Sequence, residues 1–270
     1  MGKLGNLFVI KLGGSVITNK GVPLSPSLEN IRLIASELSA TASSMSNLKT
    51  ILIHGGGSFG HYYAKKFGLG TTVGKYSAEG VARTSGAMIK LHSILLDELC
   101  DSGFFCRTIL PTELYRPGAS GIDSGAVDRI EEIFANGLFP ITFGFVNLTN
   151  SGAYIISGDK IAVDLASALH VTRTLFVMDV DGVYPSPKLK GDILPELFRE
   201  NLRISSSVKK LDVTGGIRAK ITAGFELADL GADVYFLNGA KPGRLRKALT
   251  NPRQVIATKI YSTKKSPPYS

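Results

Sequence analysis

The chain alternates between short apolar runs rich in β-branched residues and longer stretches whose apolar residues recur every three or four positions. The short runs predict strands and the longer stretches predict helices. The expected strands are residues 7–12, 50–54, 104–110, 139–146, 173–179, 233–237 and 255–258. The expected helices are residues 27–42, 77–102, 125–136, 160–169, 217–230 and 242–249. This alternation predicts βαβ units around a mostly parallel, buried sheet.

The longest predicted helix, residues 77–102, illustrates the spacing. Its apolar residues share one face, which we expect to pack on the core: Val81, Met88, Leu91, Leu95 and Leu99. Residues 43–47, 69–75 and 185–192 are expected to be loops. The proline-rich end, residues 262–270, is expected to be a frayed tail.

The composition is that of a globular protein, with 270 residues of which 44% are hydrophobic and 20% charged. This length allows one large α/β unit or two closely packed lobes. No window of roughly 18 unbroken apolar residues predicts a membrane-spanning helix, and the first residues lack a signal-peptide pattern. Because the only cysteines are Cys100 and Cys106, we expect a soluble protein of the reducing cytoplasm.

The formal net charge of +9 is compatible with nucleic acid, an acidic membrane surface or a small anionic substrate as the binding partner. The basic residues are scattered in ones and twos, without zinc-finger spacing or an aromatic RNA-binding stretch. We therefore expect a small anion to be bound, and neither nucleic acid nor a membrane.

Two glycine-rich loops directly follow predicted strands, KLGGS at residues 11–15 and HGGGSFGH at residues 54–61. Glycines allow backbone N–H groups to approach an anion closely, and phosphate is the natural ligand of such loops. The carboxyl ends of parallel strands meet at one crevice, so both loops should face the same ligand. Neither loop has the pattern of a P-loop or of a dinucleotide-binding fingerprint.

Three further motifs also lie at the start of a predicted helix or at the end of a predicted strand. Gly215 and Gly216 open a predicted helix within the segment DVTGGIRAK, residues 212–220, which places Lys220 one turn inside on the Gly216 face. Ser157, Gly158 and Asp159 precede another helix, and DVDGVY follows a strand at residues 179–184.

The five motifs in this order, KLGGS, HGGG, a central G-D, DVDGVY and TGG-x-x-x-K, resemble the amino acid kinase family over nearly the whole chain. Within that family, Lys20 and His61 make the chain most similar to the isopentenyl phosphate kinases. The resemblance implies a three-layer α/β/α sandwich with a mostly parallel central sheet, in a single domain. It further implies an acceptor-binding half at about residues 1–170, an ATP-binding half at about residues 171–260, and a homodimer.

The same resemblance implies ATP with Mg²⁺ as co-substrate and the conversion of isopentenyl phosphate to isopentenyl diphosphate. Lys11 and Lys220 would hold the ATP phosphates, Lys20 would contact the transferred phosphoryl group, and Asp159 would orient the lysines. The remaining ATP-side positions would be Gly13, Gly14, Ser15, Gly57, Asp179 and Gly216. The acceptor-side positions would be Gly56, His61 and Gly158. No His or Cys cluster suggests a metal site built by the protein itself.

Several of these residues have a plainer interpretation. Lys20 could be a solvated surface lysine, Asp159 could cap the helix that follows it, and Asp181 with Gly182 could form only a turn. His54 is expected to pack at its strand end, whereas His92 and His170 are placed on helices without a functional role. The chain also has Ser157 where the family often has glycine, and Tyr62 where proline often follows the histidine, which bears on substrate preference.

The alternatives are a kinase for another small phosphate or phosphonate, such as fosfomycin, a kinase for an amino acid acceptor, and a non-catalytic nucleotide-binding protein of the same fold. An isopentenyl tail requires an apolar pocket. The expected wall of that pocket is the helix at residues 77–102 together with residues 139–146.

Overall fold

The computed structural model describes residues 6–115, 121–185, 191–200 and 215–262. Most of the expected tail at residues 262–270, part of the expected loop at 185–192, and residues 212–214 of the third glycine motif lie outside the described residues. No helix in the described part of the chain is both long enough and apolar enough to cross a membrane.

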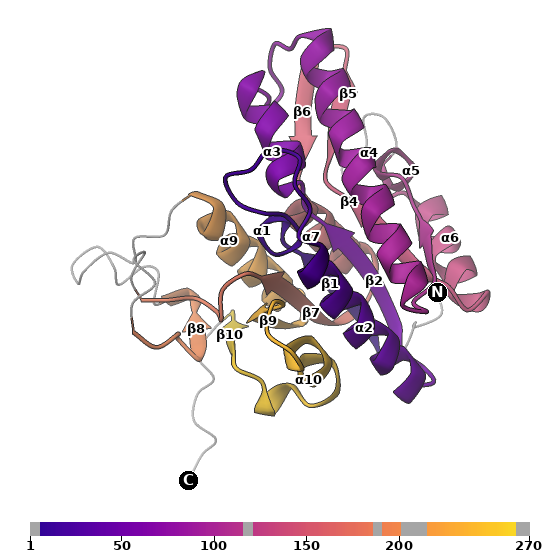
Figure 1. Cartoon of the computed structure of the whole chain (residues 1–270), viewed down its shortest axis with the longest axis vertical. Helices are drawn as coiled ribbons and strands as arrows, with labels where there is room; N and C mark the ends of the chain where they lie inside the picture. The colour runs from indigo at the N-terminus through magenta and orange to yellow at the C-terminus, as the bar shows by residue number, and fades with distance from the viewer. Residues whose placement is uncertain (1–5, 116–120, 186–190, 201–214, 263–270) are drawn as a thin grey trace.

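The centre of the molecule is an eight-stranded sheet (Figure 1). Its spatial order is β3 (Cys106–Thr108), β4 (Phe139–Phe143), β2 (Lys49–His54), β1 (Leu7–Leu12), β7 (Val171–Met178), β9 (Asp233–Asn238), β10 (Ala257–Tyr261) and β8 (Glu196–Phe198). All neighbouring pairs are parallel except β9 with β10, which is antiparallel. The prediction of a mostly parallel sheet is confirmed.

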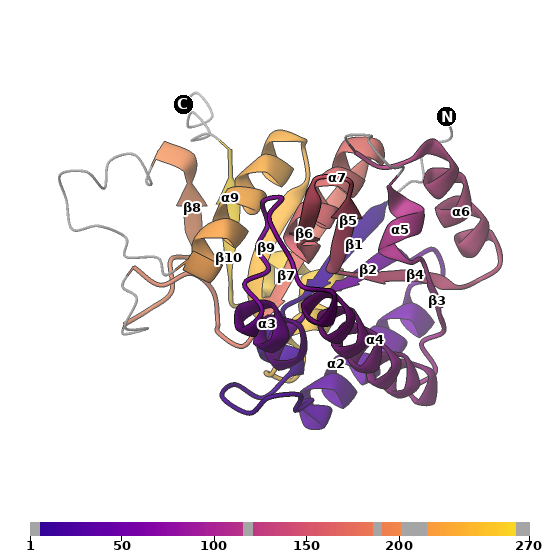
Figure 2. The same ribbon diagram turned by 90° about the horizontal axis from the view of Figure 1, so that it is seen from above.

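Helices cover both faces of this sheet, as the view from above shows (Figure 2). One face carries α2 (Leu28–Ser44), α4 (Ala78–Asp101) and α10 (Arg244–Thr250). The other carries α6 (Ser124–Ala135), α7 (Gly158–Ala168) and α9 (Gly215–Asp229). The other helical segments are α1 (Gly14–Ile17), α3 (Gly57–Lys66), α5 (Pro111–Leu114) and η2 (Pro252–Gln254). The arrangement is the expected three-layer α/β/α sandwich.

Strand β1 shows how the two cores are separated. Its side chains alternate between the faces, so Leu7 and Val9 pack with α6, α7 and α9, whereas Phe8 and Ile10 pack with α2, α4 and α10. All six residues of the strand are buried. By the same alternation, Lys11 points to the face covered by α7, which is how a charged residue enters the interior.

The expected single strand at residues 139–146 is wrong, because it breaks at Gly144. Strand β4 ends at Phe143, and β5 (Phe145–Thr149) turns back as an antiparallel hairpin with β6 (Gly152–Ile156). A side chain at Gly144 would meet the Gly158 backbone nitrogen at 3.2 Å, so the chain passes tightly there and changes direction. The turn residues Asn150 and Ser151 could have predicted this hairpin.

Two other strands have boundaries that differ from those expected. The expected strand at residues 104–110 pairs only over Cys106–Thr108, because the Phe104 N–H donates to the Leu99 carbonyl oxygen at the end of α4 and Leu110 is the N-cap of α5. The last strand begins at Ala257 rather than residue 255, since the η2 turn ends just before Val255. Strands β6 and β8 and the short helical segments α1, α5 and η2 are not predicted by the sequence.

Candidate active site

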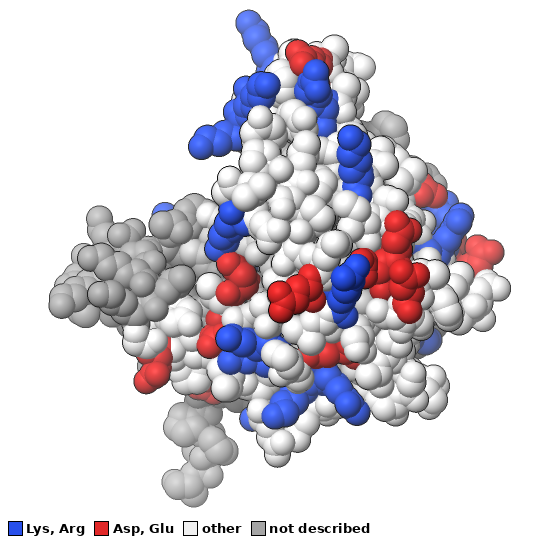
Figure 3. All heavy atoms as spheres, in the orientation of Figure 1, with Lys and Arg blue, Asp and Glu red and all other residues white. Residues whose placement is uncertain are grey.

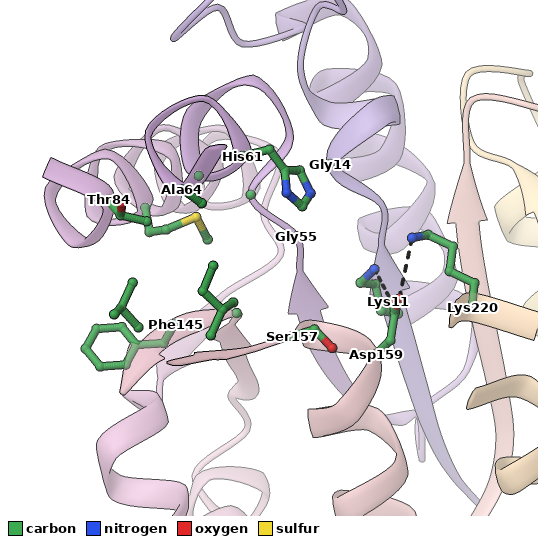
Figure 4. Close-up of a pocket in the computed structure, with 17 residues that line it drawn as sticks. Lys11, Gly14, Gly55, His61, Ala64, Thr84, Phe145, Ser157, Asp159 and Lys220 are labelled. Carbon is green, nitrogen blue, oxygen red and sulfur yellow. Dashed lines mark hydrogen bonds and ion pairs between the residues drawn. The ribbon is translucent and has the colours of Figure 1, made fainter. Parts of the chain in front are cut away.

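A pocket opens at the carboxyl ends of β1 and β2, between the first turns of α3 and α7 (Figure 4). Lining residues come from both halves of the chain: Lys11, Gly14, Gly55, Gly56, Gly60, His61, Ala64, Thr84, Met88, Gly144, Phe145, Val146, Ile155, Ser157, Gly158, Asp159 and Lys220. The two glycine loops therefore face one cavity, as the sequence predicted.

One end of the pocket is charged. Lys11 Nζ lies 2.5 Å from Asp159 Oδ1, and Lys220 Nζ lies 3.4 Å from Asp159 Oδ2. Lys220 Nζ is also 3.5 Å from the Gly216 carbonyl oxygen, so this lysine does lie over the Gly216 face of α9. The three groups come from β1, α7 and α9, and the fold brings them together as proposed from the sequence.

The charges in this cluster perturb one another. Burial lowers the pKa of the Lys11 ammonium, and the nearby charge of Lys220 lowers it further, against the opposing effect of Asp159. Burial alone would raise the pKa of the Asp159 carboxyl, but the charges of Lys11 and Lys220 outweigh it and hold that pKa below its usual value. With two lysines around one carboxylate, the cluster has excess positive charge suited to a phosphate.

Asp159 is not the cap of its helix. The N-cap of α7 is Ser157, whose hydroxyl accepts a hydrogen bond from the Lys160 backbone nitrogen at 3.1 Å. Asp159 lies in the first turn, and its carboxylate faces the lysines. The interpretation as an orienting residue therefore fits the geometry better than the capping role.

The glycines of the two loops serve mainly to let the loops touch. A Cβ on Gly14 would lie 2.1 Å from the Gly57 backbone nitrogen, and a Cβ on Gly57 would lie 2.1 Å from Thr18 Oγ1. Gly57 also has a φ of +44°, which disfavours residues with a side chain. At Gly158, a Cβ would lie 3.0 Å from Lys11 Cε, so this glycine leaves room for the buried lysine.

His61 projects from the first turns of α3 toward the middle of the pocket (Figure 4). As a whole residue, His61 is exposed. The surrounding walls desolvate it partly, and this effect, followed by the charges of Lys220 and Lys11, lowers its pKa. His61 therefore stands between the charged end and the rest of the pocket, where an anion could accept its hydrogen bond.

The other end of the pocket is apolar and lies between α3, α4 and the β5–β6 hairpin. It is lined by Ala64, Thr84, Met88, Phe145, Val146 and Ile155. The hairpin is held there by a small cluster in which Ala64, Leu69, Val146 and Ala153 are buried together. The two wall segments expected from the sequence, the long helix and residues 139–146, do line this end.

The remaining predicted residues do not line the pocket: Gly13, Ser15, Lys20, Gly57, Asp179 and Gly216. Lys20 Nζ pairs instead with Asp179 Oδ2 at 2.5 Å, and its side chain is 70% exposed. This pair joins the loop after α1 to the end of β7, so the lysine proposed to contact the transferred phosphoryl group lies beside a residue proposed for the ATP side. Asp181 accepts hydrogen bonds from Asn238 Nδ2 and Arg244 Nη1 at 2.8 and 2.7 Å, which is a structural role.

The sequence located the walls of the apolar end but assigned none of its residues to the site, and it gave no site role to Gly55 and Gly60, although both belong to the second glycine motif. Periodicity alone identifies an apolar face without telling core from cavity. The prediction that His170 lies on a helix is wrong, because this residue follows the end of α7. His54 is fully buried at its strand end, as expected, but it is hydrogen-bonded to His92.

Two observations concern the charged side chains and possible metal ligands. On the face shown in Figure 3, lysine and arginine side chains are interspersed with acidic ones rather than joined in a basic stripe. Within the described ranges, no three His, Cys, Asp or Glu side chains are grouped so that they could hold a metal ion.

Comparison with known proteins agrees with this geometry. The model of the amino acid kinase family matches residues 6–238. The isopentenyl phosphate kinase of Methanothermobacter thermautotrophicus is 30% identical over 94% of this chain and 98% of its own length. That of Methanocaldococcus jannaschii is 32% identical over 90% of this chain and 95% of its own length.

Solved structures give the same result. An isopentenyl phosphate kinase structure superimposes with a TM-score of 0.76 and 29% identity, covering 94% of this chain and all of that one. The Thermoplasma acidophilum isopentenyl phosphate kinase product complex gives 0.75 at 25% identity, with the same coverage. The family match extends over most of the chain and includes the motifs that build the pocket. The chain therefore belongs to the amino acid kinase family.

Proposed function

We propose that this protein is an ATP-dependent kinase that converts isopentenyl phosphate to isopentenyl diphosphate. The observation that carries the proposal is a single pocket with a lysine-rich end and an apolar end. An acceptor with an anionic head and a short branched hydrocarbon tail matches both ends. The 30–32% identity to isopentenyl phosphate kinases over nearly the whole chain supports the same acceptor.

Phosphoryl transfer depends on alignment and on neutralising the charge of the moving group. Lys11 and Lys220 bind the ATP phosphates, and Asp159 holds both ammonium groups in position through the contacts at 2.5 and 3.4 Å. Lys20, whose side chain is exposed, exchanges its partner Asp179 for the transferred phosphoryl group. These three lysines stabilise the charge that develops in the transition state.

The acceptor phosphate is held by His61 and by the backbones of Gly56 and Gly158, which line the pocket between its two ends. Because the attacking oxygen already belongs to an anion, the reaction needs no strong general base. Asp159 is unsuited to that task, since both of its oxygens face lysines. His61 therefore acts by donating a hydrogen bond to the acceptor.

On the nucleotide side we propose Gly13, Gly14, Ser15, Gly57, Asp179 and Gly216. In this scheme the acceptor half comprises about residues 1–170 and the ATP half about residues 171–260. Mg²⁺ would be bound mainly through the phosphates of ATP. The active protein is a cytoplasmic homodimer.

An amino acid acceptor fits the pocket less well. Recognition of a carboxylate in two contacts favours arginine, and no arginine is among the described residues that line this pocket. The closely placed Lys11, Asp159 and Lys220 also argue against a protein that has lost the chemistry.

The test is a coupled ADP-release assay with Mg²⁺-ATP and isopentenyl phosphate, run beside glutamate, uridylate and fosfomycin. We expect ADP formation with isopentenyl phosphate and the product isopentenyl diphosphate by mass spectrometry. Turnover of glutamate, uridylate or fosfomycin, with none of isopentenyl phosphate, would contradict the proposal. ATP binding by calorimetry without turnover of any acceptor would favour a non-catalytic binder.

A further inference from the structure

Two buried histidines lie behind the second glycine loop. His54 is the last residue of β2 and is fully buried, and His92 on α4 is 6% exposed. His54 Nε2 lies 3.0 Å from His92 Nδ1, and His92 Nε2 lies 2.8 Å from Thr108 Oγ1. At the other end, His54 Nδ1 lies 3.2 Å from the Gly55 carbonyl oxygen. A continuous chain of hydrogen bonds thus runs from β3 to the glycine loop.

The group at the end of this chain, the Gly55 carbonyl oxygen, decides which atom is the donor in every hydrogen bond of the chain. The Gly55 carbonyl oxygen can only accept, so His54 Nδ1 carries the proton and His54 Nε2 presents a lone pair. His92 Nδ1 must then donate to His54, which leaves His92 Nε2 to accept from the Thr108 hydroxyl. Both rings therefore adopt the Nδ1–H tautomer.

Both rings are also neutral. Burial, with the neighbouring His92 as a lesser cause, lowers the pKa of His54 to about 3. Burial lowers the pKa of His92 to about 4. Phe143 packs beside both rings, with centroids at 5.2 and 4.6 Å. At neutral pH the chain therefore holds one fixed arrangement of donors and acceptors.

This arrangement fixes a peptide that lines the pocket. In a trans peptide the C=O and the N–H point in opposite directions, and no described peptide bond is cis. While His54 holds the Gly55 carbonyl oxygen, the Gly56 N–H of the same peptide must point away from α4. In the part of the chain that the structure describes, that N–H has no hydrogen-bond partner, and Gly56 lines the pocket.

We propose that His92, acting through His54, is a positioning residue that holds the Gly56 N–H toward the acceptor's phosphate. An aliphatic pair could fill the same space without the cost of burying two imidazoles. A satisfied polar chain, by contrast, fixes a single orientation of the peptide at its end. The inference rests on the proposed function only for the identity of the acceptor.

The tautomers can be measured independently of any activity. In protein labelled with ¹⁵N in its imidazoles, long-range ¹H–¹⁵N correlation spectra distinguish Nδ1–H from Nε2–H rings. The chain has four histidines, so single His→Gln variants assign every signal. We expect Nδ1–H for both His54 and His92 at pH 7. An Nε2–H ring or exchange between tautomers at either position would overturn the proposed chain.

The positioning role is tested with inorganic phosphate as the probe, followed by the backbone ¹H–¹⁵N signal of Gly56. In His92→Leu the donor to His54 is lost, so the Gly55 carbonyl oxygen is released and phosphate should bind about tenfold more weakly. His92→Gln restores binding to within about threefold, because one amide can donate to His54 and accept from Thr108. Leu95→Ala, a core change on the same helix, should lower stability but leave phosphate binding unchanged.

The kinetic counterpart is a rise in the acceptor KM of His92→Leu with an unchanged ATP KM. Unchanged phosphate binding in folded His92→Leu, or equal weakening in Leu95→Ala, would overturn the positioning role. These outcomes differ from failure of the proposed function. If only the proposed function were wrong, the wild type would bind phosphate at Gly56 without phosphorylating isopentenyl phosphate.

Discussion

The two ends of the pocket are built in different ways. At the charged end, Lys11 comes from the end of a buried strand, Asp159 from the first turn of α7 and Lys220 from the second turn of α9. Their positions are set by direct ionic contacts. At the apolar end, side chains from α3, α4 and the β5–β6 hairpin meet without any directional bond, around the small cluster that includes Ala64 and Val146.

This difference predicts different tolerance to change. A buried charge left without its partner is costly, and the geometry of a charged cluster permits little adjustment. Apolar packing is non-directional, and a pocket of this kind can accept ligands of other sizes once a side chain is shortened. Changes at the charged end should therefore affect the rate, whereas changes at the apolar end should affect the choice of acceptor.

The largest effect is expected at Lys11. Lys11→Met should lower kcat by roughly a thousandfold, because it removes a positive charge aimed at the ATP phosphates and leaves Asp159 with Lys220 alone. The measurement is steady-state ADP release at saturating ATP and isopentenyl phosphate.

Lys160→Met provides the matched control. Lys160 directly follows Asp159 in the sequence, but its ammonium pairs with Asp164 and its side chain is 61% exposed. Its kcat should equal that of the wild type. A fall in Lys11→Met no larger than that in Lys160→Met would remove Lys11 from the transition-state contacts.

Lys20 should give the next largest effect, although it lies outside the pocket in this structure. Lys20→Ala is expected to lower kcat by about a hundredfold while the Kd for ATP changes little, if its ammonium acts mainly on developing charge. Calorimetry for ATP together with steady-state kinetics separates the two quantities. Lys65→Ala, at an exposed position on α3, is the control. A kcat like that of the control would return Lys20 to the role of a surface lysine.

The two ends also differ in how far the sequence predicts them. Lys11 and Lys220 could be found because each lies at a fixed distance from a glycine motif, and such motifs mark strand and helix ends. The ion pair of Lys20 with Asp179 joins two loops far apart in sequence. No local pattern predicts it.

At the apolar end, the sequence located the walls but not the lining. Met88 and Leu91 lie on the same predicted face of one helix, yet Met88 lines the pocket and Leu91 is in the core. The difference arises where Gly56 and Gly60 approach the Met88 sulfur, since a Cβ on either would lie within 3.0 Å of it. Such a contact depends on tertiary packing, and so does the break of the sheet strand at Gly144.

Met88 is therefore the position at which the apolar end can be tested. Met88→Ala should lengthen the cavity, so kcat/KM falls for isopentenyl phosphate and rises for a ten-carbon prenyl phosphate, with about a thirtyfold change in their ratio. The kcat for isopentenyl phosphate should change little, because the charged end is intact. Ile89→Ala is the control, since Ile89 is 56% exposed on the same helix. A large fall in kcat with no change in the ratio would mean that the ends are not independent.

The last prediction concerns stability and the histidine pair behind the loop that joins the two ends. The pKa values of His54 and His92, about 3 and about 4, lie below the ordinary value of about 6.5. The unfolded chain therefore binds more protons, and the folded state is fully stabilised above pH 6.5 and loses stability as the pH falls toward 4.

Over this pH range, protonation of each of these two histidines in the unfolded chain should raise the unfolding equilibrium constant by about tenfold for each pH unit by which the pH falls. His92→Gln removes one of them, so its free energy of unfolding should fall less steeply than that of the wild type between pH 6.5 and 4.5. Urea titrations at several pH values measure both slopes, and His170→Gln, at an exposed position, should keep the wild-type slope. Equal slopes for His92→Gln and the wild type would mean that His92 is not held neutral in the folded state. The hydrogen-bond directions that orient Gly56 would then be lost, and the apolar and charged ends would have no shared support behind the loop.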